Sequence, residues 1–259
     1  MCLIVFAYNC HPDYSLILGA NRDEYRDRQA EQARFWPDSP HILAGRDRQG
    51  GGTWLGVTTD GKLAAITNYR DPCHQVADPP SRGTLVSSYL LNKMVTTEEF
   101  QRTLNREGRL YDGFNLLYGT SRDLHYFTNR GGSSGPVTPG IHGLSNHLLD
   151  TRWPKLIAAR SRLKTILQQK HVDPEQIFKA LSDPTPFAVR LLPDTGVGPE
   201  RERLLSPIFI ADEGYCTRST TVLLIDRSGQ VTFIERTFAP SQGDSPTKRY
   251  SFLIQPHPR

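Results

Sequence analysis

Cysteine is scarce in this chain of 259 residues, and its spacing excludes several kinds of site. The four cysteines are Cys2, Cys10, Cys73 and Cys216. They form neither a CxxC pair nor a CxxCH haem-attachment motif, so the spacing gives no support for a metal centre or covalently bound haem. We therefore predict no metal site and expect reduced thiols, as in a cytoplasmic protein.

Long apolar runs and a one-sided charge are also missing. No segment is long enough to span a membrane. The N-terminus lacks the basic leader and small-residue cleavage site of a signal peptide. The net charge is only +4, and no basic stripe carries interleaved aromatic residues. We expect a cytoplasmic protein with no transmembrane segment and no nucleic-acid partner.

Two short apolar runs at the N-terminus predict a β-hairpin. Residues 3–8 and 15–20 form the runs, and residues 9–13 between them are typical of a turn. The second run stops at four polar residues, Asn21-Arg22-Asp23-Glu24. Because an antiparallel pair returns the chain close to its start, we expect Cys2 and Asp23 to be neighbours in space.

Cys2 directly follows the initiator Met1, which gives it a special chemical option. If Met1 is removed, Cys2 carries both a thiol nucleophile and an α-amine of near-neutral pKa that can serve as its base. Asp23 could orient that amine, and Arg22 could lower the pKa of the thiol. The simpler alternative is a buried strand cysteine beside a solvated turn.

The rest of the chain predicts an α+β fold with mainly antiparallel sheets. Hairpins dominate and βαβ units are scarce, so we expect one domain over residues 1–259. Strands are predicted at 42–44, 63–67, 114–118, 124–127, 141–145, 220–225 and 230–236, and residues 50–57 are predicted as a flexible entry followed by a strand. Helices are predicted from Ser81, over 96–105, over 151–169 with Asp150 as the cap, and over 174–181. Loops are predicted at 25–40 and 183–206, the second a candidate flap, and 240–259 is read as a polar tail.

Three more polar residues lie at the ends of predicted strands, and with the N-terminal features they resemble a known family. Asn68, Asn146 and Arg218 occupy these positions. The whole chain resembles the NRDE family, also called the transport-and-Golgi-organisation family, which is named for the motif at residues 21–24. The Met-Cys start, Gly-Gly-Thr-Trp-Leu-Gly at 51–56, Thr-Asn-Tyr-Arg at 67–70 and Leu-Ser-Asn at 144–146 also fit that family.

That family is similar to the N-terminal-nucleophile (Ntn) hydrolases of the penicillin V acylase and bile-salt hydrolase branch. The resemblance implies a four-layer α-β-β-α sandwich with two mainly antiparallel sheets. It implies that Cys2 is nucleophile and base, Asp23 orients the amine and Asn68 stabilises the oxyanion. Asn146 would bind the amine or the attacked carbonyl, and Arg218 would balance charge near the thiolate. The other motif residues, Asn21, Arg22 and Glu24, are predicted to bind ligand. One position departs from the hydrolase pattern, since Ala20 occupies the place of an arginine.

Two functions of different class follow from these residues. The first is a cysteine amidohydrolase that cleaves a non-peptide C–N bond of a small or lipid-like amide through a thioester and requires no cofactor. The second, implied by the family resemblance, is a non-catalytic protein that binds and traffics haem or an acyl lipid in the same pocket. His74 beside Cys73, His142 and His147 are then the candidate haem ligands. A structural scaffold with a vestigial site is the third hypothesis.

Overall fold

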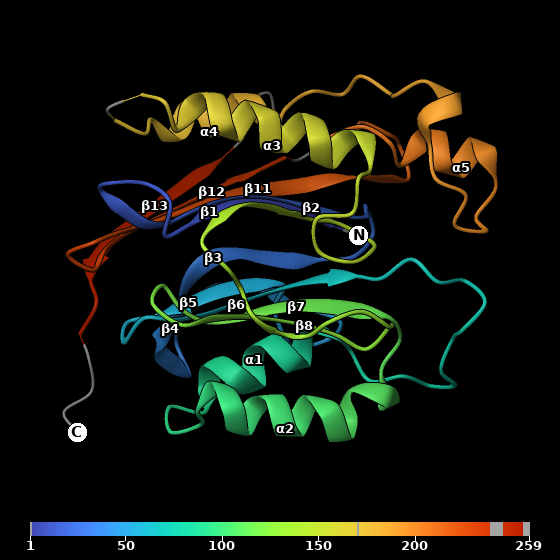
Figure 1. Cartoon of the computed structure of the whole chain (residues 1–259). Helices are drawn as coiled ribbons and strands as arrows, with labels where there is room; N and C mark the ends of the chain where they lie inside the picture. The colour runs from blue at the N-terminus through green and yellow to red at the C-terminus, as the bar shows by residue number, and fades with distance from the viewer. Residues whose placement is uncertain (1, 170, 239–245, 256–259) are drawn as a thin grey trace.

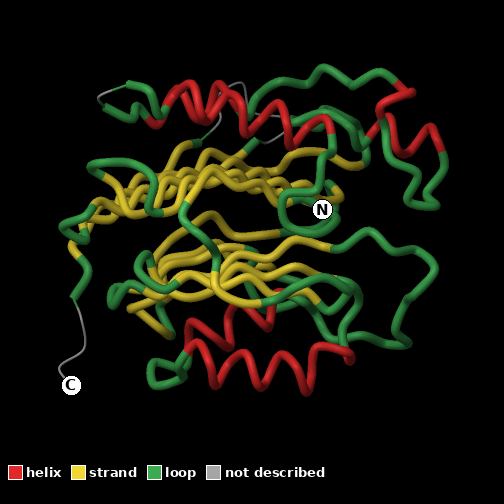
Figure 2. Tube along the Cα trace, viewed as in Figure 1, coloured by secondary structure: helices red, strands yellow, loops and turns green. Residues whose placement is uncertain are grey.

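Two antiparallel sheets lie face to face, and helices cover the outer side of each sheet (Figure 1; Figure 2). The structure is a computed structural model that describes residues 2–169, 171–238 and 246–255. The layer order is α3 and α4, then the first sheet, then the second sheet, then α1 and α2, as Figure 1 shows. The predicted α-β-β-α sandwich is confirmed.

The first sheet contains six strands in the order β10-β1-β2-β11-β12-β13. Each neighbouring pair is antiparallel. The strands are β1 (Cys2–Tyr8), β2 (Tyr14–Tyr25), β10 (Gly140–Leu144), β11 (Tyr215–Asp226), β12 (Gln230–Thr237) and β13 (Thr247–Leu253). The central position of β1 and β2 places the N-terminal hairpin inside the sheet instead of at its edge.

The second sheet contains seven strands in chain order from β3 to β9. They are β3 (Ala30–Trp36), β4 (Ser39–Asp47), β5 (Leu55–Thr58), β6 (Lys62–Asn68), β7 (Phe114–Thr120), β8 (Leu124–Thr128) and β9 (Gly135–Pro136). β6 ends at Asn68, so this sheet also delivers a predicted site residue at a strand end.

The helices are short and lie on the outer faces. They are α1 (Gly83–Leu91), α2 (Thr97–Glu107), α3 (Pro154–Ile166), α4 (Pro174–Ala180) and α5 (Pro199–Leu204), with 3-10 turns at Gly108–Leu110 and Val189–Leu191. Within the described ranges, no helix is both long and apolar enough to cross a membrane.

Apolar side chains fill three layers of the sandwich. One cluster, including Phe6, Leu18 and Phe233, lies between the two sheets. A second joins the first sheet to α3 and α4, and a third joins the second sheet to α1 and α2. Burial on both faces explains why β1 and β2 read as continuous apolar runs instead of alternating ones.

Several predicted elements are corrected by the structure. The region 25–40 was predicted as a loop but contains β3, and the polar tail contains β13, which pairs with β12. The remainder of that tail, 239–245 and 256–259, lies outside the described residues. The predicted flap at 183–206 contains a 3-10 turn and α5. These strands were missed because charged residues line their exposed faces.

Two helices begin where the sequence predicts, and two predicted caps are wrong. The structure adds a capping box of Thr96 and Glu99 at the start of α2 and an Asp173 cap at the start of α4. Ser81 makes no side-chain cap at α1. Asp150 does not cap α3, which begins only at Pro154, because its carboxylate instead accepts the Gly143 N–H at 2.8 Å. The single-domain assignment over 1–259 stays a prediction.

Candidate functional site

The pleat of β1 and β2 divides the N-terminal polar residues between two faces of the first sheet. Alternate side chains of a strand point to opposite faces. Ile4 and Ala20 belong to the cluster between the sheets, whereas Leu3 and Ile17 belong to the cluster beneath α3 and α4. The register pairs Cys2 with Arg22, so both side chains are on the face between the sheets. The same alternation carries Asn21 and Asp23 to the helix-covered face.

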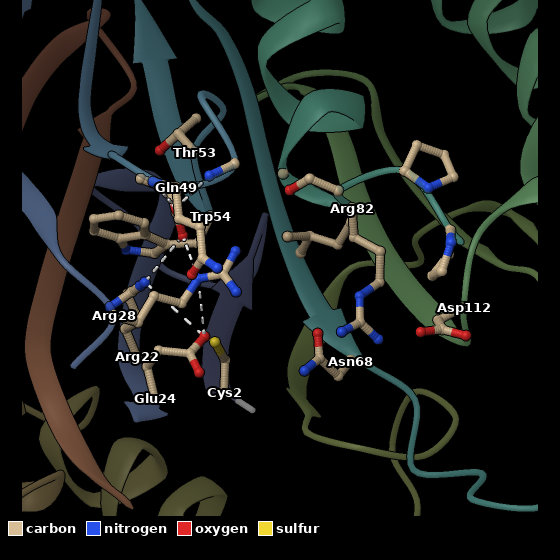
Figure 3. A pocket seen from close by; sticks show the side chains of 17 residues that line it. Cys2, Arg22, Glu24, Arg28, Gln49, Thr53, Trp54, Asn68, Arg82 and Asp112 are labelled. Carbon is tan, nitrogen blue, oxygen red and sulfur yellow. Dashed lines mark hydrogen bonds and ion pairs between the residues drawn. The ribbon is translucent and has the colours of Figure 1, made fainter. Parts of the chain in front are cut away.

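A cavity of about 370 Å³ opens between the sheets where β1 begins and β6 ends (Figure 3). Of the predicted site residues, Cys2, Arg22, Glu24 and Asn68 line it. Its other lining residues are Arg28, Asp47, Gln49, Gly50, Thr53, Trp54, Ile66, Pro79, Pro80, Ser81, Arg82, Gly83 and Asp112. Most of these side chains are polar or charged, so the cavity suits a small polar ligand.

Cys2 presents its thiol to this cavity from the first residue of β1. Burial raises the pKa of the Cys2 thiol, an effect that the charge of Asp23 strengthens and the charge of Arg22 opposes. The carbonyl of Cys2 accepts a hydrogen bond from Ser145 Oγ at 3.1 Å. A thiol with a raised pKa is protonated at neutral pH, so it needs a base before it can attack.

A compact charge cluster forms the wall beside the thiol. Asp47 Oδ2 accepts hydrogen bonds from Arg28 Nε at 2.7 Å and from Arg22 Nη2 at 3.4 Å. Burial alone would raise the pKa of Asp47, but the hydrogen bonds from Arg28 and the Gly50 N–H, together with the charges of Arg28 and Arg22, outweigh it and hold that pKa low. Glu24 lies 3.8 Å from Arg28 and 4.0 Å from Arg22, whose guanidinium stacks 4.3 Å from the centre of the Trp54 ring. These groups neutralise each other.

Asp23 lies behind the cavity, on the helix-covered face. It is 1% exposed, and its carboxylate accepts a hydrogen bond from Thr217 Oγ1 at 2.6 Å. Burial raises the pKa of Asp23, and the charge of Lys155 acts to lower it. Cys2 and Asp23 are close in space, as expected, since the register pairs Cys2 with Arg22, the neighbour of Asp23, and both the charge and the backbone of Asp23 act on the pKa of the Cys2 thiol.

Asn146 supports the site from outside the cavity. It is fully buried, and its side-chain amide donates to the carbonyl of Asn68 at 3.0 Å. Its own carbonyl accepts the Arg70 N–H at 2.7 Å, and its Oδ1 lies 3.2 Å from Ser145 Oγ. Asn146 therefore fixes the backbone on which Asn68 stands, and it connects through Ser145 to Cys2.

Like Asp23 and Asn146, the predicted site residues Asn21 and Arg218 do not line the cavity. Asn21 points to the helix-covered face, where its amide donates to the carbonyls of Leu181 at 2.9 Å and Ile208 at 2.8 Å. Arg218 sits in a β-bulge of β11 and donates to the carbonyl of Tyr25 at 3.1 Å. The bulge turns its guanidinium toward the end of β2, so the charge near the thiol comes from Arg22 instead.

The histidines proposed as haem ligands differ in their surroundings. Both ring nitrogens of His142 have partners, Asp150 Oδ2 at 2.7 Å and the Thr138 carbonyl at 2.9 Å. His147 is placed against Tyr69, with ring centroids 4.9 Å apart. His74 is exposed and lines a second cavity of about 360 Å³. That cavity adjoins the first, since both are lined by Glu24, Arg28, Asn68, Arg82 and Asp112.

Sequence reasoning missed two cations near the thiol. Lys155 lies in a predicted helix but was not among the predicted site residues, yet it is 4% exposed and donates to the Leu205 carbonyl at 3.0 Å. Burial lowers the pKa of Lys155 to about 8. Arg82 lines the cavity from the start of α1. Pro154, just before Lys155, was the sequence signal that the helix starts later and presents a different face. No sequence signal pointed to Arg82.

Comparison with known proteins agrees with the fold and the motifs. A family model described as "Transport and Golgi organisation 2" matches residues 1–240. The Transport and Golgi organization 2 homolog of Mus musculus is 35% identical over 277 residues, covering 98% of this chain and 100% of that protein. The homolog of Homo sapiens is also 35% identical, with the same coverage.

Among solved structures, one similar fold is that of the C2A mutant of conjugated bile acid hydrolase from Clostridium perfringens. Its TM-score is 0.53 at 8% sequence identity, and the match covers 99% of this chain and 98% of that chain. At this identity the likeness shows the fold alone.

Proposed function

This chain belongs to the Transport and Golgi organisation 2 family, and we propose that it is an N-terminal cysteine amidohydrolase that cleaves a small polar amide. The observation that carries the proposal is the thiol of Cys2 on the wall of a polar cavity that Asn68 also lines. The solved structure of similar fold is named a hydrolase, but at its low identity the proposal relies on this chain's own residues.

The reaction requires that Met1 be removed. The freed α-amine of Cys2 then takes the thiol proton, and the sulfur forms a bond to the carbonyl carbon of the amide. The C–N bond breaks as the leaving amine takes that proton, which leaves a thioester on Cys2. Water attacks the thioester, with the α-amine again accepting a proton, and releases the carboxylic acid and the thiol.

Three residues support these steps. Asp23 lies next to the start of β1 and would hold the α-amine in position, because a buried carboxylate is stabilised by pairing with a cation. Asn68 would donate its side-chain amide to the oxyanion, and Asn146 would keep Asn68 in place through the 3.0 Å hydrogen bond to its carbonyl. The polar lining favours a small polar amide over the lipid-like substrate that the sequence also allowed.

Intact mass and amine release test this proposal. We expect the purified chain to lack Met1 and to release amine from at least one member of a panel of small polar amides. Cys2→Ala should abolish release, and Cys10→Ala, which changes an exposed cysteine, should leave it unchanged. Loss of Met1 combined with no cleavage of any amide, or equal cleavage by Cys2→Ala, would overturn the proposal.

The second candidate is a non-catalytic protein that binds and traffics haem or an acyl lipid. Three observations favour it: Ala20 stands where the hydrolases carry an arginine, burial raises the pKa of the thiol, and His74 lines the adjoining cavity. Titration with haem tests it. Saturable binding lost in His74→Ala but kept in His171→Ala, an exposed control, would support haem binding. Weak, non-saturable binding would exclude it.

A further inference from the structure

Arg82 occupies the wall of the cavity opposite the charge cluster of Arg22, Arg28 and Asp47. Figure 3 shows its guanidinium beside Asn68, across the cavity from Arg22 and Arg28. Its backbone is fixed by the loop that carries Thr53, whose N–H donates to the Gly83 carbonyl at 3.3 Å.

The loop at Gly52 packs directly against the backbone of Gly83 at the start of α1. A Cβ atom on Gly52 would lie 2.4 Å from the Gly83 carbonyl carbon, so only glycine allows the contact. The start of α1 is thereby held at the mouth of the cavity, and Arg82 is held with it.

The guanidinium of Arg82 has hydrogen-bonding capacity left over. Nη1 donates to the Gly113 carbonyl at 3.0 Å, whereas a guanidinium has five N–H donors. In the part of the chain that the structure describes, no carboxylate lies within 4.0 Å of it to form an ion pair. Asp112 and Glu24 are the carboxylates whose charges act most strongly on the pKa of Arg82. Asp112 Oδ1 already accepts the Val76 N–H at 3.0 Å.

The other two cations of the cavity are already matched by Asp47 and Glu24. Burial lowers the pKa of Arg82, which shows that its charge is partly removed from water. A guanidinium still keeps its proton at neutral pH, because its pKa is far above that of any other side chain. A partly desolvated cation with spare donors gains most from an anionic partner that fits its planar fork.

We propose that Arg82 binds an anionic group, a carboxylate or a phosphate, of the ligand that occupies the Cys2 cavity. If the amidohydrolase function also holds, on which this substrate class rests, the substrate is an amide that carries an anionic group near its scissile bond. The small volume requires that closeness, because the thiol and Arg82 line the same cavity of about 370 Å³.

Two thiol reagents of nearly equal shape test the anion site without any turnover. Iodoacetate carries a carboxylate where iodoacetamide carries a neutral amide, and each alkylates a thiol with loss of iodide and of the thiol proton. Peptide mass spectrometry reports the rate at each cysteine. The exposed Cys10 and Cys73 give the reference ratio of the two rates in the same sample.

We expect the iodoacetate-to-iodoacetamide ratio at Cys2 to exceed the reference by about tenfold, since a charge-assisted bidentate contact is worth that much. Arg82→Gln should bring the ratio down to the reference. Arg82→Lys, which keeps the charge, should retain part of the preference. Arg122→Gln, in a cavity lined by other residues, should change nothing. A ratio at Cys2 equal to the reference in wild type, unchanged by Arg82→Gln, would overturn the proposal, as would a Cys2 that neither reagent reaches.

Protection experiments separate the two anion classes. Inorganic phosphate and acetate are each added before iodoacetamide, and slower alkylation of Cys2 marks the class that binds. Protection must be lost in Arg82→Gln, and protection that survives there would count against this residue. Because these readouts need no amide cleavage, they can succeed while the proposed hydrolase activity fails, and the reverse is equally visible.

Discussion

The two faces of β2 use the same four-residue motif for different purposes. Asn21 and Asp23 lie under the helices, at 0% and 1% exposure, with hydrogen bonds to backbone or hydroxyl groups. Arg22 and Glu24 lie on the cavity face and interact with other charged side chains. Because alternate side chains of a strand point to opposite faces, the motif divides into two pairs. Asn21 and Asp23 connect the sheet to the segments that cover it, and Arg22 and Glu24 line the cavity.

This split shows that a motif of adjacent polar residues is not one binding site. Polar groups on the buried face must satisfy every donor and acceptor, because an unpaired buried group is costly. On the cavity face Arg22 is also buried, whereas Glu24 keeps partial contact with solvent, so its ion pairs contribute less to stability. Variants on the helix face should therefore act mainly on folding, and variants on the cavity face mainly on ligand recognition.

The largest effect is expected for Asn21→Ala. The Asn21 amide donates to the carbonyls of Leu181 and Ile208, and its oxygen accepts Thr220 Oγ1 at 2.6 Å. Removing it leaves three buried partners unsatisfied, so we expect the free energy of unfolding to fall by about 4 kcal/mol. Urea denaturation measures this loss. A loss below about 1 kcal/mol would contradict the structural role assigned to the helix face.

Lys155→Met should have the next largest effect. It removes a buried cation whose charge favours ionised Asp23, and we expect a loss of about 3 kcal/mol at pH 7. A carboxyl whose pKa is higher in the folded than in the unfolded state stays protonated in the folded state throughout the pH window between the two values. The free energy of unfolding therefore falls as pH rises from the unfolded pKa to the folded pKa. Losing Lys155 extends the window upward, so the deficit should be larger at pH 7 than at pH 4.

A double variant provides the control for Lys155. Asp23→Asn combined with Lys155→Met removes both charges, and most of the lost stability should return at pH 7. Additive losses in the double variant would show that Lys155 acts only through its hydrogen bond to Leu205, independently of Asp23.

Glu235 is a buried acid of β12 on the face between the two sheets, the same face as Arg22 and Glu24. Burial raises the pKa of Glu235 to about 7, although its carboxylate accepts the Ala33 N–H at 2.6 Å. The folded chain then binds a proton between about pH 4.5 and 7 that the unfolded chain releases, so stability falls as pH rises through this range. We expect wild type to lose about 2 kcal/mol between pH 5 and 8 through this group. Glu235→Gln should remove that component, and an unchanged pH profile would contradict it.

The sequence predicted the hairpin and the central strands because these depend on local patterns, whereas the layer order was implied by the family resemblance. Apolar runs of strand length and turn residues are read directly from the chain, and the motifs identified the family that the comparisons confirm. The Cys2–Arg22 register also follows from the length of the first hairpin. Which face each motif residue occupies follows from the same register once the apolar cluster on each face is known.

The rest depends on contacts between residues far apart in sequence. Arg218 follows strand-like residues, but a bulge between Thr217 and Ser219 redirects it, and bulges have no reliable sequence signal. Lys155 has the sequence signature of a surface residue, but it is buried and donates to the carbonyl of Leu205, 50 residues away. Arg82 reaches the cavity only because Gly52 and Gly83 bring two distant segments into contact.

Glu24→Gln should have the smallest effect on stability and sharpens the comparison most. Its carboxylate lies 3.8 to 4.0 Å from Arg28 and Arg22 at the partly exposed edge of the cavity. Such pairs contribute less than about 1 kcal/mol, so the free energy of unfolding of the variant should differ from that of wild type by less than this amount. Removing one negative charge from the cavity should instead raise the iodoacetate preference of Cys2 by roughly threefold, since about 0.5 to 1 kcal/mol of repulsion is lost. A variant that loses stability as Asn21→Ala does, with no change in this preference, would mean that both faces of β2 serve folding alone.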